Sequence, residues 1–207
     1  MSHIYEKDNE KFPSVTTILQ ILGSKKLLKW ANYQGFKHIN IDKVLEQTSE
    51  FGTIAHSVVQ SIVDKDNAEV LQAKDALMAL DLDNLAKKFT KSLEKHDWKT
   101  IYTEHTIISK NLGYAGTLDW LCEFDGKNSL FDFKTSKMVK TTHILQLGGY
   151  SNLLKDIEDI DVEQYGIILI SPDKCNIHII NKEEIEIAKE AFNILYNFYK
   201  LWGDKIK

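Results

Sequence analysis

Apolar and polar residues alternate with a period of two in the middle of this chain. The alternation runs from Trp98 to Ser109, from Tyr114 to Phe124 and from Ser129 to Thr135, and such runs are typical of strands. The last two runs flank Asp125-Gly126, a pair that tolerates positive φ and favours a tight hairpin turn. The pattern therefore predicts three strands, the last two of them paired as a hairpin.

The residues before these strands show helical spacing instead. Residues 1–12 are polar, and we expect a loosely held lead-in. We then expect a helix from Ser14 to Leu22, capped by Ser14, and a second helix from Lys25 to Tyr33. Gly35–Ser49 is less regular, with one helical turn. A further helix is expected from Ser49 to about Val63, followed by a helical region from Ala68 to Lys95 in which residues 81–83 favour a break.

The residues after the hairpin predict a helix, two strands and a final helix. Thr141 or Thr142 is expected to cap a helix that carries Gln146 and Tyr150 on one face. The following elements are a buried strand over Val162–Ser171, its hairpin partner Lys174–Ile180, and a terminal helix Lys182–Trp202 capped by Asn181.

The order of these elements predicts an α/β fold. We expect a central mixed sheet of about five strands with helices on both faces, in the order helices, three strands, helix, two strands, helix. A chain of 207 residues suits one domain, with an N-terminal helical part at 13–95 and a core at 98–207.

The register of the predicted hairpin brings two carboxylates together. A two-residue turn at Asp125-Gly126 opposes Asp119 and Asp132, and a four-residue loop gives the same register. The same register pairs Phe124 with Lys127 and Cys122 with Ser129. One face is then apolar, with Leu118, Trp120, Cys122, Phe124, Phe131 and Phe133, and the other is polar, with Thr117, Asp119, Asp132 and Lys134.

Two opposed carboxylates destabilise a hairpin unless something neutralises them. Oxygen ligands of this kind suit Mg²⁺ or Mn²⁺, and such an ion polarises a phosphate and activates water. Lys134, two residues after Asp132, can balance charge on the nucleophile or in the transition state. The residues alone thus favour a metal-dependent phosphodiesterase.

Several short motifs follow one another in a characteristic order. They are Pro13-Ser14-Val15-Thr16, Gly52-x-x-x-His56, Gly116-Thr117-Leu118-Asp119, Asp132-Phe133-Lys134 and Gln146-x-x-x-Tyr150. This order and spacing resembles the PD-(D/E)xK nuclease superfamily, in its RecB-like and Cas4-like exonuclease branch, which includes the mitochondrial genome maintenance exonuclease and phage relatives. The resemblance extends from Pro13 to Tyr150, about two-thirds of the chain.

The resemblance implies roles for these residues. Asp119 and Asp132 would bind the metal together with the Phe133 carbonyl, and Lys134 would orient and help deprotonate the water or stabilise the developing charge. Gln146 and Tyr150 would position the scissile phosphate and the lysine.

Two further residues are second candidates. His56 would be an active-site residue by the resemblance, whereas on the residues alone a histidine on a mostly apolar helix is more often a satisfied core residue. Glu104 is either an additional ligand or water-positioning base, or a solvent-facing strand residue. Where some relatives carry a glutamate one turn after the histidine, this chain has Gln60.

The candidates for DNA contact are Lys137, Gln146, Tyr150 and the aromatic side chains of Trp30 and Tyr33, which offer stacking surfaces. The N-terminal helices either approach DNA or close one end of the core. Lys87, Lys88, Lys91 and Lys95 either contact DNA or form a solvated face.

Composition narrows the class of nucleic-acid contact. The net charge is −4 and all 26 basic residues are lysines, so bidentate arginine readout of guanine is absent. We therefore expect contact with the DNA backbone, not with base edges. Two cysteines are too few for an iron–sulfur cluster, which needs about four.

The sequence also suggests where the protein works. No apolar run approaches the ~20 residues that span a bilayer, and the residues MSHIYEKDNE lack the apolar core of a signal peptide. We expect a cytoplasmic protein that does not enter a membrane.

The predicted function is that of a Mg²⁺- or Mn²⁺-dependent DNA exonuclease, acting on single-stranded ends in repair, recombination or replication. A helicase or recombination protein is an expected partner. Three alternatives stay open: an inactive DNA-binding or assembly module of the same fold, a nonspecific endonuclease, and a hydrolase of a small phosphorylated substrate. The lack of a phosphate-cradling glycine loop weakens the last of these.

Overall fold

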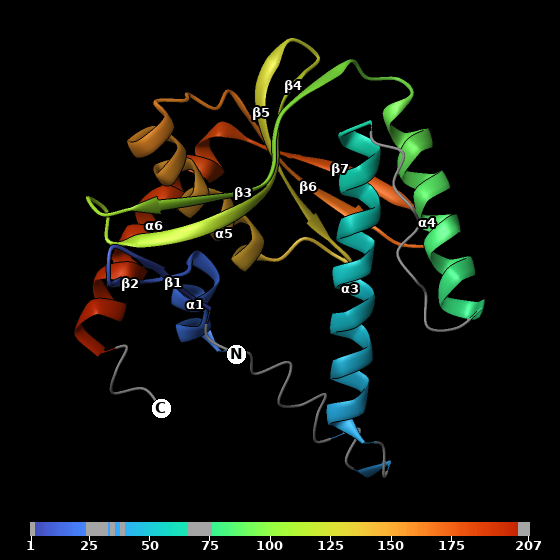
Figure 1. The fold of residues 1–207 in the computed structure, drawn as a ribbon, viewed down its shortest axis with the longest axis horizontal. Coiled ribbons are helices and arrows are strands. Elements are labelled where there is room, and N and C mark those ends of the chain that lie inside the picture. The colour runs from blue at the N-terminus through green and yellow to red at the C-terminus, as the bar shows by residue number, and fades with distance from the viewer. Residues whose placement is uncertain (1–2, 24–32, 34–35, 38–39, 66–75, 203–207) are drawn as a thin grey trace.

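Five strands form a mixed sheet in the order β3-β4-β5-β6-β7 (Figure 1), in a computed structural model that describes residues 3–23, 33, 36–37, 40–65 and 76–202. The strands are β3 (Trp98–Ser109), β4 (Tyr114–Phe124), β5 (Lys127–Lys134), β6 (Gln164–Ile170) and β7 (Cys175–Ile180). Only β5 and β6 run parallel, and the other neighbours are antiparallel. The predicted α/β fold with a five-stranded mixed sheet is confirmed.

Helices cover both faces of this sheet, as predicted (Figure 1). One face carries α3 (Ile41–Val63) and α4 (Ala76–Leu93), and the other carries α1 (Val15–Leu19), α5 (Thr141–Leu153) and α6 (Lys182–Trp202). Val59 and Phe89 pack with Trp120 on the first face, and Leu147 and Phe192 belong to the core of the second. None of the described helices is both long and apolar enough to cross a membrane.

The parallel pair β5–β6 requires a crossover, and α5 provides it. Gly148 and Gly149 lie inside this helix, where glycine costs about 1 kcal/mol relative to alanine. A Cβ on Gly148 would lie 2.8 Å from the backbone carbon of Ala188, and one on Gly149 would lie 3.0 Å from the Phe192 ring. The glycines let α6 pack closely against α5.

The β4–β5 hairpin has the predicted register. Phe124 pairs with Lys127 and Cys122 with Ser129, and Asp125 and Gly126 form the turn with φ of 50° and 76°. The ladder ends at Trp120 and Phe131, one pair before Asp119 and Asp132. The two strands diverge there, and the two carboxylates lie at the fork.

One residue of the predicted apolar face lies on the opposite side of the sheet from the others. Trp120, Cys122, Phe124, Phe131 and Phe133 share a core cluster with α3 and α4, but Leu118 belongs to the cluster on the α5 and α6 side. The reason is the fork. Before residue 120, β4 pairs with β3 alone, and this ribbon packs over the α5 side of the molecule.

The N-terminal prediction needs two corrections. Residues 3–13 are not a loose lead-in but a hairpin of β1 (Ile4–Lys7) and β2 (Glu10–Pro13), whose turn residues Asp8 and Asn9 both have positive φ. The signal was an Asp-Asn turn between two short strands. Ser14 caps the next helix as predicted, but α1 ends at Leu19 and a 3₁₀ turn, η1 (Gln20–Leu22), completes it.

Two helix boundaries also differ from the prediction. The helix expected from Ser49 begins eight residues earlier at Ile41, where the Asn40 side chain accepts a hydrogen bond from the Lys43 N–H. Helix α4 is unbroken at 81–83. At α5, neither Thr141 nor Thr142 is the N-cap, because the helix begins directly after Lys140. Most of the predicted helix Lys25–Tyr33 and the start of the Ala68–Lys95 region lie outside the described residues.

The last three predicted elements are confirmed with small shifts. Helix α5 continues into a π-helical turn, η2 (Leu154–Glu158), before β6. Strands β6 and β7 form the predicted hairpin. Helix α6 has the predicted bounds, and Asn181 accepts a hydrogen bond from the Glu184 N–H at 2.8 Å.

Strand β3 is irregular at two points. The register against β4 shifts between Thr100 and Tyr102, which places a bulge at Ile101. Glu104 has φ of 44°, a left-handed conformation that is rare for a long side chain within a strand. This residue lies directly across from Asp119 on β4, since its neighbours Thr103 and His105 pair with Trp120 and Leu118. The left-handed residue of β3 therefore lies across from a carboxylate of β4.

Candidate metal centre

Asp119 occupies the fork between β4 and β5. Its Oδ2 accepts a hydrogen bond from the Phe133 backbone N–H at 2.7 Å, in place of a ladder bond between the strands. The side chain is buried, with 8 % of the residue exposed. Because one oxygen is held by the backbone of the neighbouring strand, the direction of the carboxylate is fixed.

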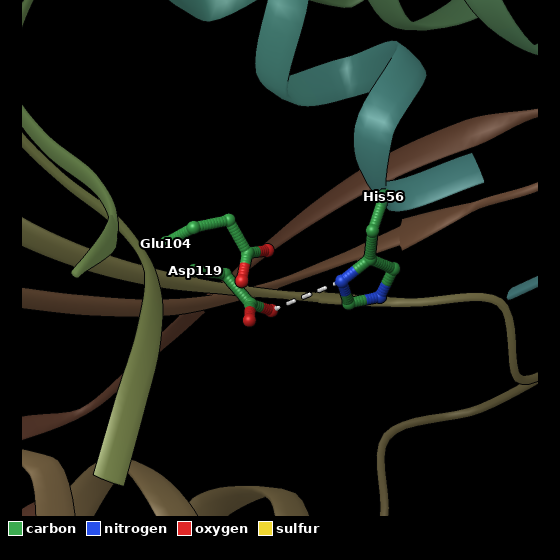
Figure 2. Close-up of side chains that lie close together, drawn as sticks. All are labelled: His56, Glu104 and Asp119. Atoms are coloured by element: carbon green, nitrogen blue, oxygen red, sulfur yellow. Dashed lines mark ion pairs between the residues drawn. The ribbon is translucent and has the colours of Figure 1, made fainter. Parts of the chain in front are cut away.

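His56 and Glu104 approach Asp119 from opposite sides (Figure 2). Helix α3 places the His56 Nδ1 atom 3.8 Å from Asp119 Oδ2, and Glu104 reaches over from β3. One ligand atom of each of the three residues lies within 4.8 Å of the others. The structure thus brings both second candidates, His56 and Glu104, to Asp119.

Asp132 is the most deeply buried carboxylate of the site. The residue is 0 % exposed, and its Oδ1 has no hydrogen-bond partner among the described residues. Its Oδ2 pairs with the Lys134 Nζ atom at 2.5 Å. A buried carboxylate oxygen without a partner is costly, and a bound cation would offset that cost.

The pKa values of the site follow from this burial. Loss of water raises the pKa of Asp132 to about 7 and that of Asp119 to about 6, although the Lys134 charge opposes both shifts. The pKa of Glu104 is also raised, mainly by desolvation and further by the Asp132 charge. Lys134 has a raised pKa, because the attraction of the acids outweighs its own burial. The lysine is therefore charged at neutral pH, while the acids compete for protons.

The Phe133 backbone links the acids to His56. Burial and the Lys134 charge lower the pKa of His56, whereas a hydrogen bond with the Phe133 backbone raises it. Only an acceptor favours the protonated ring, so this contact is to the carbonyl oxygen. The Phe133 carbonyl, which we predicted as a metal ligand, thus faces the His56 ring at the site.

The donor set fits a hard divalent cation. Three carboxylates, one backbone carbonyl and one imidazole meet within one region, and oxygen-rich sets of this kind suit Mg²⁺ or Mn²⁺. The buried Oδ1 of Asp132, which has no hydrogen-bond partner among the described residues, is the local observation that supports the fit. The residues that would hold such an ion are Asp119, Asp132, Glu104 and His56, with the Phe133 carbonyl beside them.

Gln146 and Tyr150 approach from the other side of the sheet. The Gln146 Nε2 donates a hydrogen bond to the Tyr150 hydroxyl at 2.7 Å, and both residues are buried. The Tyr150 ring lies against Gly116 of β4, where a Cβ would be 2.6 Å from the ring. Burial, Asp132 and Asp119 raise the pKa of Tyr150, so the two acids are near its hydroxyl and the phenol keeps its proton.

A polar hollow opens next to the acids. It has a volume of about 520 Å³ and is lined by Gly52, Thr53, His56, Ser57, Gln60 and Glu104. Gln60, which replaces the glutamate of some relatives, donates a hydrogen bond to the Thr103 hydroxyl. The hollow gives a substrate a route to His56 and Glu104 along the polar face of α3.

The other predicted DNA-contact residues come from different parts of the chain. Lys137 is exposed in the loop between β5 and α5, beside a second pocket of about 320 Å³ that Lys174 also lines. Tyr33 is exposed, and the Lys37 Nζ atom lies 4.6 Å from the centroid of its ring. This contact does not connect Tyr33 to the acids. Trp30 lies outside the described residues. Of the α4 lysines, Lys87 pairs with Asp83 at 2.6 Å.

One residue of this region was missed by the sequence interpretation. His143 is buried at the start of α5, at the i and i+3 spacing from Gln146 that puts both on one helix face. The lysine of the site affects its pKa. The spacing 143, 146, 150 was visible in the sequence and is the signal that would have found it.

Comparison with known proteins adds no family to this description. Neither a protein-family model nor a curated protein sequence matches the chain. The nuclease resemblance therefore stays a prediction from the order and spacing of its motifs.

Proposed function

We propose that this protein is a metal-dependent nuclease that hydrolyses DNA phosphodiester bonds from strand ends. The observation that carries the proposal is the pairing of Lys134 with the buried Asp132, beside the cluster of Asp119, Glu104 and His56. Bound Mg²⁺ or Mn²⁺ would supply a Lewis acid for the phosphate and lower the pKa of a water. The cellular context we propose is repair, recombination or replication in the cytoplasm.

The protein side chains then have distinct tasks. Lys134 stays charged, so it can hold the attacking water and stabilise negative charge that develops on the phosphate. Asp119 is fixed by the Phe133 N–H and keeps the ligand geometry rigid. Glu104, whose pKa is raised, is the best-placed group to accept a proton from the water.

Gln146 and Tyr150 form the opposite wall of the site. Their mutual hydrogen bond leaves the Gln146 carbonyl oxygen and the Tyr150 proton available to a neighbour. Since the tyrosine keeps its proton, it can donate to a phosphate oxygen or orient Lys134. Helix α5 thus holds the phosphate from one face of the sheet while α3 supplies His56 from the other.

Cleavage from an end is the specific form of the proposal. The chain has net charge −4 and no arginine, so it has few means to hold a stiff internal duplex site. A flexible single strand can enter the polar hollow beside His56 and Glu104 more readily.

The test compares a linear single strand with a covalently closed circle of the same sequence. Both present the same phosphates, and only the linear strand has ends. We expect short products from the linear strand with Mg²⁺ or Mn²⁺, survival of the circle, and no cleavage with EDTA. Equal degradation of the circle would replace the exonuclease by a nonspecific endonuclease.

A matched pair of lysine variants completes this test. Lys134→Ala removes the proposed catalytic ammonium, whereas Lys182→Ala removes an exposed lysine at the start of α6 that no described contact ties to the site. Binding without cleavage by the parent protein would favour the inactive DNA-binding module instead. Cleavage that Lys134→Ala leaves within about tenfold of the parent would remove this lysine from the mechanism.

A further inference from the structure

Helix α6 carries a second apolar stripe besides the one that packs on the sheet. The buried stripe consists of Ile185, Ala188, Phe192 and Tyr196. The second stripe consists of Ile187, Ala191, Ile194, Phe198 and Leu201, which follow one another at alternating intervals of four and three residues. These intervals form the heptad repeat by which one helix packs along another. A helix that only covers a sheet needs one stripe, so the second stripe indicates another partner.

The second stripe is exposed along its length. Ile187, Ile194 and Leu201 are 59 %, 69 % and 72 % exposed, and Phe198 between them is also exposed. The stripe runs over roughly four helical turns, or about 21 Å. Single exposed apolar side chains are normal on a protein surface, whereas a continuous row of them marks an interaction surface.

An apolar groove lies beside the first half of this stripe. It has a volume of about 490 Å³, and its walls come from η1, α5 and α6. The apolar side chains that line it include Leu22, Ile144, Leu145, Ile187, Ala191 and Ile194. Phe198 and Leu201 lie farther along α6, past Leu195, the last residue that lines the groove. The same face of α6 therefore has a hollow at its start and projecting apolar side chains at its end.

This surface is complementary to itself when two copies lie antiparallel. A two-fold axis across α6 brings Phe198 and Leu201 of each copy to the groove of the other, which makes the contact isologous. The first turn of α6 carries Glu183 and Glu184, and its last turn carries Lys200. Each acidic helix start then lies beside the basic end of the partner helix, and the two helix dipoles oppose each other.

We propose that α6 is a homodimer interface, in which the exposed stripes of two copies pack antiparallel around a two-fold axis. The partner is a second copy of this chain because one stripe supplies both the groove and the side chains that fill it, and both signs of charge. The polar hollow beside His56 and Glu104 lies along α3, which covers the opposite face of the sheet from α6 (Figure 1). The interface therefore leaves this hollow open in both copies.

Sedimentation equilibrium of the full chain, without DNA or metal, tests the proposal. The measured mass should rise from 23.8 kDa toward twice this value as the protein concentration increases. Ile194→Glu puts a charge at the centre of the interface in both copies, so it should raise the Kd of the dimer by roughly 30-fold or more. Its Tm at low concentration should stay close to that of the parent, because Ile194 is exposed in the single copy.

A matched control comes from strand β7. Ile179 is 52 % exposed there, and Ile179→Glu should leave the Kd of the dimer unchanged. A parent that is monomeric at every concentration, or equal Kd values for the two variants, would overturn the proposal. A monomeric parent whose Tm falls with Ile194→Glu would overturn it too, and would show that the chain itself covers the stripe.

Charge reversal tests the antiparallel direction. Glu183→Lys and Lys200→Glu should each raise the Kd of the dimer about fivefold, because each replaces an attraction between the copies by a repulsion. The double variant exchanges the two signs and should return the Kd to within about twofold of the parent. A double variant as weak as the single ones would rule out the antiparallel pair. Since no measurement uses cleavage, a failure here is distinct from a failure of the proposed function.

Discussion

Asp132→Asn should make the metal-free protein more stable at pH 8, although it removes a charged residue from an ion pair. Burial raises the pKa of Asp132 from 3.8 to about 7. A carboxyl group whose pKa is higher in the folded state than in the unfolded state destabilises the protein as it ionises. The loss of stability runs from the pKa of the unfolded state to the pKa of the folded state. The parent protein should therefore lose stability between about pH 4 and pH 7 through this group.

The size of the effect follows from the shift. A difference of about 3 pH units, at ~1.4 kcal/mol per unit, corresponds to ~4 kcal/mol of destabilisation at pH 8 and ~2 kcal/mol at pH 5. Asparagine has the same shape and avoids this penalty. Lys134 loses one partner in the variant, but Asp119 and Glu104 still attract it, and it stays charged at both pH values. The loss of that partner therefore cancels when the two pH values are compared.

Urea denaturation of the parent and the variant at pH 5 and pH 8, with EDTA, measures this difference. We expect the difference in free energy of unfolding between Asp132→Asn and the parent to grow by ~2 kcal/mol from pH 5 to pH 8. The same difference corresponds to a shift of several degrees in Tm. Saturating Mn²⁺, at about a hundred times its Kd, should then stabilise the parent by ~3 kcal/mol and the variant far less.

Asp125→Asn is the control for this experiment. The pKa of Asp125 is lowered, chiefly by its hydrogen bond with His96, so removing its charge should have the opposite sign at neutral pH. The reasoning about Asp132 is refuted if the parent and Asp132→Asn have the same dependence on pH, or if Mn²⁺ stabilises both equally.

Three further changes test other parts of the site and its support. Lys134→Ala should fold and bind DNA but lose cleavage by ~100-fold or more, measured in single-turnover assays with the Lys182→Ala control; a loss below tenfold would contradict its role. Gly148→Ala should destabilise by ~1–2 kcal/mol in urea despite its better helix propensity, because its Cβ meets the Ala188 backbone; an unchanged midpoint would contradict this. Gly116→Ala should displace the Tyr150 ring and lower kcat with little change in Tm. An unchanged kcat would show that the position of the ring does not matter for cleavage.

The strands of the core were predictable because their alternation is strong and their turns are distinctive. Asp125-Gly126 predicts the hairpin register, which opposes Asp119 and Asp132, although the observed ladder ends one pair earlier at Trp120 and Phe131. Leu118 was misplaced because alternation assumes one continuous partner. The loss of β5 as a neighbour beyond Trp120 is a tertiary event that the local pattern does not contain.

The helix boundaries were less predictable for a physical reason. Residues 41–50 of α3 are mostly exposed and lie at the end that projects away from the sheet in Figure 1, so they need no apolar stripe. Helical spacing in the sequence begins only where α3 meets the core. The irregular reading of Gly35–Ser49 followed from that missing stripe.

The site itself was predicted only in part. Sequence reasoning placed the acids and the lysine, but it had no means of showing that Glu104 and His56 converge on Asp119 while Asp132 pairs with Lys134. That division depends on which carboxylate the Phe133 N–H holds. His143 was missed, although its i and i+3 spacing from Gln146 was visible in the sequence.

The left-handed backbone of Glu104 has an evolutionary consequence. A long side chain at φ of 44° costs about 1–3 kcal/mol, and glycine or asparagine would relieve much of this strain. Selection for stability alone would therefore replace the glutamate, while selection for the carboxylate would retain it. Among sequences that diverge from this one, glutamate at this position is expected where the site is still in use. Glycine or asparagine is expected where only the fold is maintained.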